Sequence, residues 1–423
     1  MKYLFVQWLE RPLPSCLERD VAVHLDSGKV ICLIGIRRTG KTFLLFDFMQ
    51  KLISSGVDRR QIIYLNFDDD RIYPVTSNQL DLILQAHGEL YPDYQTQKRY
   101  IFLDEVQAVP GWERYVRRLY DTENVQIFVT GSSSHLLAGE LAPALRGRSV
   151  FIEVFPLSFS EFLRFKKIEL HGYSRKSESK ATNALEDYIS WGGLPEIVLA
   201  EPAMRPLILE EYISLLYYKD MVERFDIRNE PILRLILKSC CSQPASLISV
   251  HRLYRDIKSM GFKTSKNTVY DYLHYLQEAR ILFALPLYTR SVRKQEQNPK
   301  KYHLIDVGLA RAYRPDPDAD KGHKLENLVY LREQRKRAEL YYYKNGHELD
   351  LVITDNSPCY VNTAWSITSP GAVRREEAAM RFGRKMFPHG EGTLVCHELP
   401  ASGIDAPFRI MPAWKYLLDQ DMS

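Results

Sequence analysis

The segment GIRRTGKT, residues 35–42, combines residue types and a spacing that can bind a row of phosphate groups. In the pattern G-x-x-x-x-G-K-[ST], the glycines let backbone N–H groups turn toward phosphate oxygens, the lysine reaches the outer phosphates, and the threonine hydroxyl can bind Mg²⁺. A tight basic turn before a helix is the alternative interpretation. The residues expected to contact a nucleotide here are Gly35, Arg37, Arg38, Thr39, Gly40, Lys41, Thr42 and Phe43.

Two adjacent acids, Asp104 and Glu105, directly follow the apolar run IFL. If that run is a buried strand of a parallel sheet, the acids lie at its carboxyl end, where ligands bind in open α/β sheets. Asp104 would then hold Mg²⁺ together with Thr42, and Glu105 would orient or deprotonate the attacking water. An acidic pair can also cap a helix, but a cap does not explain its position after a phosphate loop. Lys41, Asp104 and Glu105 are therefore the main catalytic candidates.

Further candidates follow the next two apolar runs. In VTGSSS, residues 129–134, Thr130 or Ser132 could sense the γ-phosphate, and Ser132 is preferred; a simple helix cap is the alternative. Arg146 and Arg148 could neutralise charge at the γ-phosphate, from the same chain or from a neighbouring subunit. Exposed or structural ion pairs are the alternative for both arginines.

Five apolar, β-branched runs alternate with helical segments up to residue 155. The first run is almost continuously hydrophobic, as expected of a strand buried on both faces. This alternation predicts an α/β fold, with a parallel sheet covered by helices on both faces. The phosphate-binding segment then stands between the first strand and the first helix, where such loops bind phosphate. The runs are residues 29–35, 61–67, 99–105, 125–131 and 149–155.

With the motifs GIRRTGKT, YLNFDDDR, FLDEVQ, TGSSS and FPLSFSEFL in this order, the chain resembles a prokaryotic AAA-type family of P-loop ATPases, related to the archaeal-ATPase and STAND branch. The segments WGGLPEIVL, residues 191–199, and YYKDMVERFDIR, residues 217–228, extend this resemblance over essentially the whole chain. It implies an ASCE P-loop NTPase core over residues 1–155, a helical lid over residues 156–228, and ATP rather than GTP as the nucleotide.

Residues 229–310 are predicted to form a winged helix-turn-helix. Three helical segments, residues 231–241, 249–261 and 264–280, precede two strands around a basic asparagine–proline turn within residues 281–306. In that fold the third helix enters a DNA major groove and the wing touches phosphates. Winged helices also bind proteins, and charged hairpin tips are often only solvated. The DNA-binding candidates are Lys263, Ser265, Lys266, Asn267, Tyr270, Arg293, Lys294, Lys300 and Lys301.

Residues 311–423 resemble a domain of unknown function with a restriction-endonuclease-like α/β fold. Active nucleases of that class need a helix glutamate, a strand aspartate and E-x-K on the next strand, which hold Mg²⁺ and stabilise charge near the attacking water. Glu326 and Asp350 fit the first two places, but Asn362, Thr363 and Ala364 stand at the third. Without the second acid and the lysine, we expect a degenerate site at Glu326, Asp350 and Asn362, and no nuclease activity.

Composition limits the remaining choices. A net charge of +4 and a hydrophobic content of 45% are typical of a globular protein, and no apolar run is long enough for a membrane helix, which predicts a cytoplasmic protein. Six scattered cysteines without C-x-x-C indicate neither a zinc site nor a disulfide framework. The sequence therefore predicts an Mg²⁺-dependent ATPase that couples its nucleotide state to a partner, foremost DNA. The alternatives are a nucleotide-controlled signalling or defence scaffold with protein partners, and a small-molecule kinase. Under each of these functions the protein could also form an oligomer.

Overall fold

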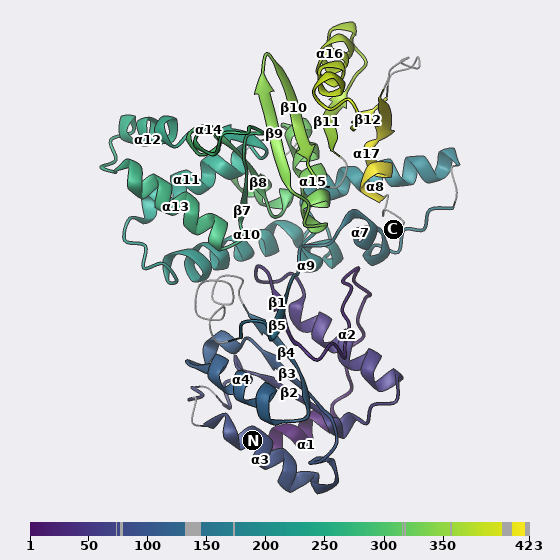
Figure 1. Cartoon of the computed structure of the whole chain (residues 1–423), viewed down its shortest axis with the longest axis vertical. Helices are drawn as coiled ribbons and strands as arrows, with labels where there is room; N and C mark the ends of the chain where they lie inside the picture. Colours follow the sequence, from purple (N-terminus) through teal and green to yellow (C-terminus); the bar gives the residue numbers. More distant parts are fainter. Residues whose placement is uncertain are drawn as a thin grey trace. The chain divides into compact units, whose positions relative to one another are not determined.

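The computed structural model describes residues 1–72, 74–76, 79–131, 145–171, 174–314, 316, 319–355, 358–399 and 408–418. Contacts within the chain define two compact units. The first comprises Met1–Phe155 with Glu278–Arg280, and the second comprises Pro156–Gln277 with Ile281–Ser423. Figure 1 shows the elements of each unit. The finer boundaries expected after residues 228 and 310 stay predictions.

The first unit is built on a five-stranded sheet in the order β2-β3-β4-β1-β5. Every pairing in it is parallel, which confirms the predicted α/β fold. Its central strands carry continuous apolar runs because helices cover both of their faces. The strands are β1 (Val30–Ile34), β2 (Ile62–Asn66), β3 (Arg99–Asp104), β4 (Val125–Gly131) and β5 (Ser149–Glu153).

Helices lie on both sides of this sheet (Figure 1). Helix α2 (Lys41–Ser54) buries residues such as Phe48 against one face, which Ile31 and Leu33 of β1 also line. Helices α3 (Asp81–Leu90) and α4 (Trp112–Thr122) contribute to the core on the other face. Burying a side chain of this size stabilises the fold by about 1.5–3 kcal/mol. The amino-terminal helix α1 (Lys2–Glu10) packs beside β2, and short 3₁₀ turns complete the unit at Arg59–Gln61, Pro92–Tyr94 and Val106–Ala108.

The second unit begins with helices. Helix α7 (Phe159–Phe165) starts at a capping box, in which the Ser158 hydroxyl accepts from the Glu161 N–H and the Glu161 carboxylate accepts from the Ser158 N–H. Helices α8 (Arg175–Trp191), α9 (Pro195–Leu199) and α10 (Arg205–Leu215) follow, and α10 continues into a π-helical segment, Leu216–Val222.

Four helices, the last of them short, and a small antiparallel sheet come next, in the chain order α11-β6-α12-α13-β7-α14-β8. The expectation of a plain turn between the last two strands is wrong, because a short helix, capped by the Ser291 hydroxyl, interrupts the connection. The sheet order is β6-β8-β7. The elements are α11 (Glu230–Ser242), β6 (Ser246–Ile248), α12 (Val250–Ser259), α13 (Lys266–Glu278), β7 (Leu282–Leu285), α14 (Val292–Gln297) and β8 (Lys300–Leu304).

The last part of the second unit is a five-stranded mixed sheet in the order β13-β12-β11-β10-β9. Strands β9, β10 and β11 pair antiparallel, whereas β11, β12 and β13 pair parallel. None of the helices in the described ranges combines the length and the hydrophobicity needed to cross a membrane. The elements are a 3₁₀ segment at Val307–Tyr313, α15 (Lys321–Arg335), β9 (Leu340–Asn345), β10 (His347–Ile353), β11 (Cys359–Ser366), α16 (Pro370–Met386), β12 (Glu391–Glu398), β13 (Arg409–Pro412) and α17 (Ala413–Leu418).

Candidate functional site

The loop between β1 and α2 depends on glycine at both of its ends. Gly35 has φ +152° and Gly40 has φ +91°, backbone conformations that side chains rarely adopt. A Cβ atom at Gly35 would lie 2.4 Å from the carbonyl oxygen of Val154. The two glycines of the predicted phosphate motif therefore stand where the backbone requires them.

Lys41, the first residue of α2, is only 5% exposed. Its ammonium group donates to the carbonyl oxygens of Gly35, at 3.0 Å, and Ile36, at 3.1 Å. The side chain thus curls back over the loop, and the positive charge is held among the backbone groups that would face a phosphate.

A buried arginine that no motif indicated braces the same loop. Arg19 donates to the carbonyl oxygen of Thr39 at 2.8 Å and to that of Phe155 at 2.8 Å. The Thr39 hydroxyl in turn donates to the carbonyl oxygen of Ile36 at 3.0 Å. The conformation of the loop is therefore set by side chains from several parts of the first unit.

Asp104, at the carboxyl end of β3, is fully buried and accepts three side-chain hydrogen bonds. Thr42 and Tyr64 donate to its Oδ2 atom at 2.8 and 3.2 Å, and Thr130 donates to its Oδ1 atom. Burial, and then the charge of Glu105, raise the pKa of Asp104, while the three donors oppose that rise. The structure thus brings together Thr42 and Asp104, the two residues expected to hold a metal.

Glu105 adopts a left-handed backbone conformation with φ +53°. Its N–H group donates to the Thr130 hydroxyl at 3.0 Å, and its carboxylate accepts from the Gln107 amide. For a residue with a side chain, this conformation costs about 1–2 kcal/mol, and such strain concentrates at functional sites. Thr130 therefore contacts both acids, and the expected sensing of the γ-phosphate by Thr130 or Ser132 stays a prediction.

The remaining residues expected to contact the nucleotide differ in how far they are exposed. The ring of Phe43 is 56% exposed and packs edge-on against Phe46. Arg37 and Arg38 are half-buried in the loop, Arg38 with φ +61°. Ser132 lies outside the described residues.

Arg148 does not lie near the acids within its own chain. Its guanidinium pairs with Asp121 at 2.9 Å, and its carbonyl oxygen accepts from Val30 at the amino end of β1. Asp104 lies at the opposite, carboxyl end of the parallel strands, and a five-residue strand is about 16 Å long. The expectation of charge neutralisation by Arg148 within its own chain is therefore wrong, whereas a contribution to the site of a neighbouring subunit stays a prediction. Arg146 is exposed, two residues earlier along the chain.

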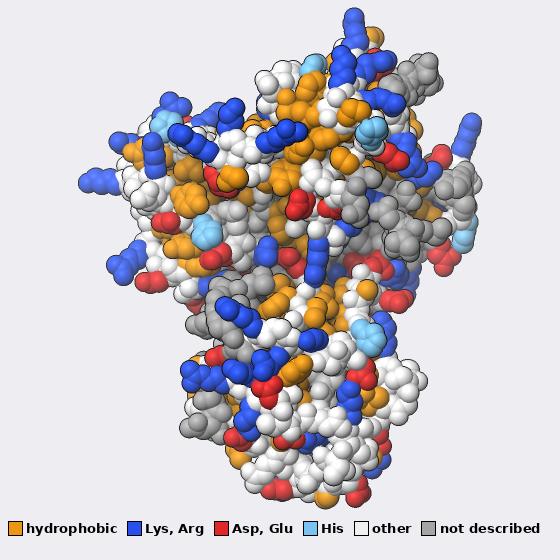
Figure 2. All heavy atoms as spheres, viewed as in Figure 1, with side chains coloured by type: hydrophobic (Ala, Val, Ile, Leu, Met, Phe, Trp, Pro, Cys, Tyr) orange, Lys and Arg blue, Asp and Glu red, His pale blue; other side chains and the backbone are white. Residues whose placement is uncertain are grey.

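The basic candidates of the second unit divide into exposed and buried groups. Lys263, Ser265, Lys266, Asn267 and Tyr270 are all exposed at the start of α13. Arg293 and Lys294 are exposed on α14, and Lys300 pairs with Glu296 at 3.0 Å. Figure 2 shows Lys and Arg side chains gathered over this part of the second unit.

Lys301 is the exception, because it is only 3% exposed and cannot contact DNA from the surface. Its ammonium group lies 2.7 Å from Glu326, 3.0 Å from Glu348 and 3.1 Å from Asp350. Burial opposes its charge, but the three carboxylates outweigh burial and hold the pKa of Lys301 well above its ordinary value. The expectation that Lys301 belongs to a DNA-binding surface is therefore wrong.

This cluster occupies the predicted degenerate nuclease site. The lysine expected on β11 in an active nuclease is missing, but Lys301 of β8 lies among the acids of α15 and β10. Asn362 of β11 is buried and satisfied: its oxygen accepts from the Asp350 N–H, and its NH₂ group donates to the Glu348 carbonyl and the Glu376 carboxylate, each at 3.2 Å.

An open cavity of about 770 Å³ lies beside Glu326, Asp350 and Asn362. Across the described ranges, no three His, Cys, Asp or Glu side chains are arranged to hold a metal ion. The absence of nuclease activity stays a prediction.

Two family models match the chain. An AAA domain model matches residues 27–163, which include the loop, Asp104 and Glu105. A model for a domain of unknown function, DUF8612, matches residues 182–319. Among solved structures, the Walker-type ATPase PABY2304 of Pyrococcus abyssi is similar over 72% of this chain and 99% of that chain, at 15% identity and a TM-score of 0.44.

Relatives of similar length exist in an archaeon and a bacterium. The uncharacterized protein MJ1544 of Methanocaldococcus jannaschii is 31% identical over 86% of this chain and 80% of its own length. An uncharacterized protein of Haemophilus influenzae is 29% identical over 81% of this chain and 84% of its own length. The chain therefore belongs to the family of AAA-type P-loop ATPases that includes MJ1544.

Proposed function

We propose that this protein binds ATP with Mg²⁺, hydrolyses it, and uses its nucleotide state to control binding of a partner, foremost DNA. The observation that carries the proposal is the 2.8 Å hydrogen bond between Thr42, at the end of the glycine loop, and the buried Asp104. This hydrogen bond joins the phosphate loop to the expected metal ligand Asp104, although Thr42 and Asp104 lie 62 residues apart in the sequence. The AAA family membership supports ATP as the nucleotide.

The donors present suit Mg²⁺, which prefers oxygen ligands. The Thr42 hydroxyl and the Asp104 carboxylate would hold the ion, which would neutralise charge on the outer phosphates. Lys41 would turn from the loop carbonyls to phosphate oxygens. Glu105, fixed through its N–H group by Thr130, would orient the attacking water and accept its proton.

Lys41→Ala is expected to weaken ATP binding about 10–100-fold, because a charged hydrogen bond contributes about 1.5–3 kcal/mol and each 1.4 kcal/mol corresponds to tenfold in affinity. Titration with a fluorescent ATP analogue, followed by phosphate-release assays, measures the change. Lys51→Ala is the matched control, since Lys51 lies on the same helix, has a side chain that is 46% exposed, and pairs with Asp47 rather than with the loop. Unchanged ATP binding and turnover in Lys41→Ala would show that the assigned phosphate site is wrong.

The exposed basic residues of α13 and α14 support DNA as the partner. Apart from the additional helix α14, the chain order of α11 to β8 is that of a winged helix, and α13 would be its recognition helix. Exposed Lys266 and Asn267 at its start, and Arg293 and Lys294 on α14, supply the charge and hydrogen-bond donors for phosphates.

The double substitution Lys266→Ala/Arg293→Ala is expected to make the plot of log binding constant against log salt concentration less steep for duplex DNA. The magnitude of its negative slope should fall by about 2, because each phosphate contact contributes about 0.9. Fluorescence anisotropy with labelled duplex DNA gives that slope when it is measured at salt concentrations from about 50 to 200 mM, where the affinity changes steeply. Lys176→Ala/Lys180→Ala, exposed on α8, serves as the control. Wild-type protein that binds no DNA, with an ATPase rate indifferent to DNA, would exclude the DNA partner and favour a protein partner.

A further inference from the structure

The hydroxyl of Tyr64, the first residue of the YLNFDDDR segment, contacts the candidate nucleotide site from a strand that supplies none of the expected phosphate, metal or catalytic residues. Tyr64 lies on β2, beside β3. Its hydroxyl donates at 3.2 Å to Oδ2 of Asp104, the same oxygen that accepts from Thr42 at 2.8 Å. One of the two donors on this atom therefore comes from outside the phosphate loop.

An aromatic cluster holds the Tyr64 ring in place. Its centroid lies 5.1 Å from that of Trp8 on α1 and 5.3 Å from that of Phe46 on α2. Arg59 covers Trp8, with its guanidinium 5.0 Å from the ring, and also donates to the Trp8 carbonyl at 2.7 Å. The amino-terminal helix is thus packed, through one side chain, against the residue that contacts Asp104.

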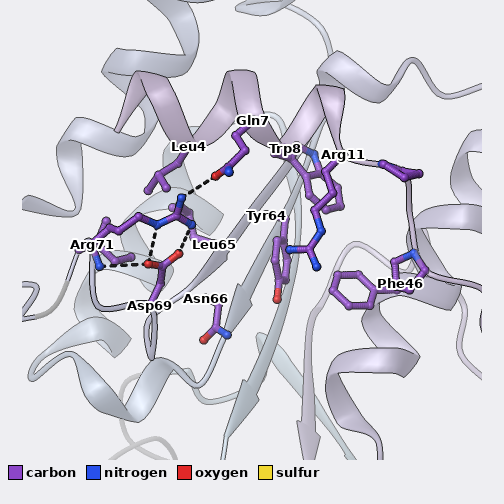
Figure 3. Close-up of a pocket in the computed structure, with 13 residues that line it drawn as sticks. Leu4, Gln7, Trp8, Arg11, Phe46, Tyr64, Leu65, Asn66, Asp69 and Arg71 are labelled. Atoms are coloured by element: carbon purple, nitrogen blue, oxygen red, sulfur yellow. Dashed lines mark hydrogen bonds and ion pairs between the residues drawn. The ribbon is translucent and has the colours of Figure 1, made fainter.

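Figure 3 shows Trp8, Tyr64 and Phe46 on the wall of a cavity. The volume of this cavity is about 190 Å³. The hydroxyl of Tyr64 bonds to Asp104, and Tyr64 is also one of the residues that line this cavity. The aromatic contacts and this hydrogen bond therefore hold Tyr64 in its orientation.

We infer that Tyr64 is a positioning residue of the nucleotide site, which orients the Asp104 carboxylate for the metal, and that Trp8 of α1 keeps Tyr64 in that position. The inference rests on the proposed function. With Thr130 on Oδ1 and Tyr64 on Oδ2, the carboxylate is held at both oxygens by donors that do not themselves belong to the phosphate loop. Partners of this kind fix the direction of a metal-binding group, and their loss costs about 10–100-fold in metal affinity.

Tyr64→Phe tests the inference, because it keeps the ring and removes only the hydroxyl. ATP affinity is measured by titration in EDTA and at a series of Mg²⁺ concentrations. We expect the Mg²⁺ concentration for half-maximal enhancement of ATP binding to rise about tenfold or more, with the affinity in EDTA unchanged. Trp8→Leu, which removes the aromatic contact but leaves the hydroxyl, should shift the Mg²⁺ requirement in the same direction by a smaller factor.

Tyr115→Phe is the matched control. Tyr115 is a buried tyrosine of the same unit whose hydroxyl has no hydrogen-bond partner among the described residues, so its Mg²⁺ response should equal that of the wild type. A wild-type Mg²⁺ requirement in Tyr64→Phe would overturn the inference while leaving the proposed function intact. Equal losses of affinity with and without Mg²⁺ would also overturn it, since they indicate a structural role alone. Wild-type protein that binds no ATP would remove the proposed function and the inference together.

Discussion

Glu105→Gln is expected to lower ATP turnover about 10²–10⁴-fold while Mg²⁺-dependent ATP binding persists, because a positioned general base contributes an effect of this size. The backbone of Glu105 is fixed in its left-handed conformation, and its N–H group donates to Thr130 at 3.0 Å. Glutamine has the same length and keeps that backbone contact. The substitution therefore removes the proton acceptor with little change to the phosphate and metal groups.

Single-turnover phosphate release measures the chemical step, and titration with a fluorescent analogue measures binding. Glu113→Gln makes the same chemical change on α4, outside the site, and should leave both quantities unchanged. Wild-type turnover in Glu105→Gln would exclude Glu105 as the base. Loss of binding together with turnover would instead indicate that Glu105 is needed to form the site.

Lys301→Met is expected to destabilise the second unit by about 3–5 kcal/mol, the cost of breaking a buried ion pair by removing one partner. The change removes the one ammonium group in the described residues that pairs with all three carboxylates, those of Glu326, Glu348 and Asp350. Methionine fills a similar volume, so the loss reports on charge rather than on a cavity. Urea unfolding, with hydrogen exchange of β10 amides as a local probe, measures the effect.

The loss of stability in Lys301→Met should grow with pH, because of the raised pKa of Glu326 in the wild type. Burial, and then the charge of Asp350, raise the pKa of Glu326 from 4.5 to about 8, with Lys301 opposing the rise. A carboxyl group whose folded pKa is raised binds more protons when folded, so its contribution to stability is present below pH 4.5 and is lost as pH rises through about 8. Without Lys301 the free energy of unfolding should fall more steeply with pH. The loss of stability of Lys301→Met relative to the wild type should therefore be larger at pH 9 than at pH 6.

Lys344→Met is a matched control, because Lys344 also pairs with Glu348, at 2.9 Å, but its side chain is 52% exposed. An exposed pair contributes about 0–1 kcal/mol, so this variant should remain close to the wild type. Lys301→Met/Glu326→Gln, which also removes one acid, should recover part of the lost stability. Wild-type stability of Lys301→Met at high pH would show that the cluster does not depend on the ammonium charge.

The part of the candidate site that could be predicted from sequence is the part encoded by neighbouring residues. Gly35, Gly40 and Lys41 lie within one short loop, whose backbone requirements appear directly in the residue types. The acids are separate in sequence, but carboxyl ends of parallel strands meet at one edge of a sheet. The alternating apolar runs, read with this rule, were sufficient to place Asp104 beside Thr42.

The tertiary structure alone decided which other residues join these groups. Lys300, the first residue of β8, is partly exposed, whereas all residues from Lys301 to Leu304 are buried, so both faces of the strand are covered from Lys301 onward. A run of lysines beside a turn does not reveal which is which. Tyr64 likewise reaches Asp104 only because β2 pairs with β3 in one register.

The sequence by itself therefore determined the phosphate loop, the acidic pair and the parallel sheet that carries them, since each follows from local spacing and hydrophobic periodicity. The bracing of the loop by Arg19, the orientation of Asp104 by Tyr64 and the burial of Lys301 among three acids depend on contacts between distant segments. Such contacts are set by strand register and side-chain direction, which a single sequence does not specify.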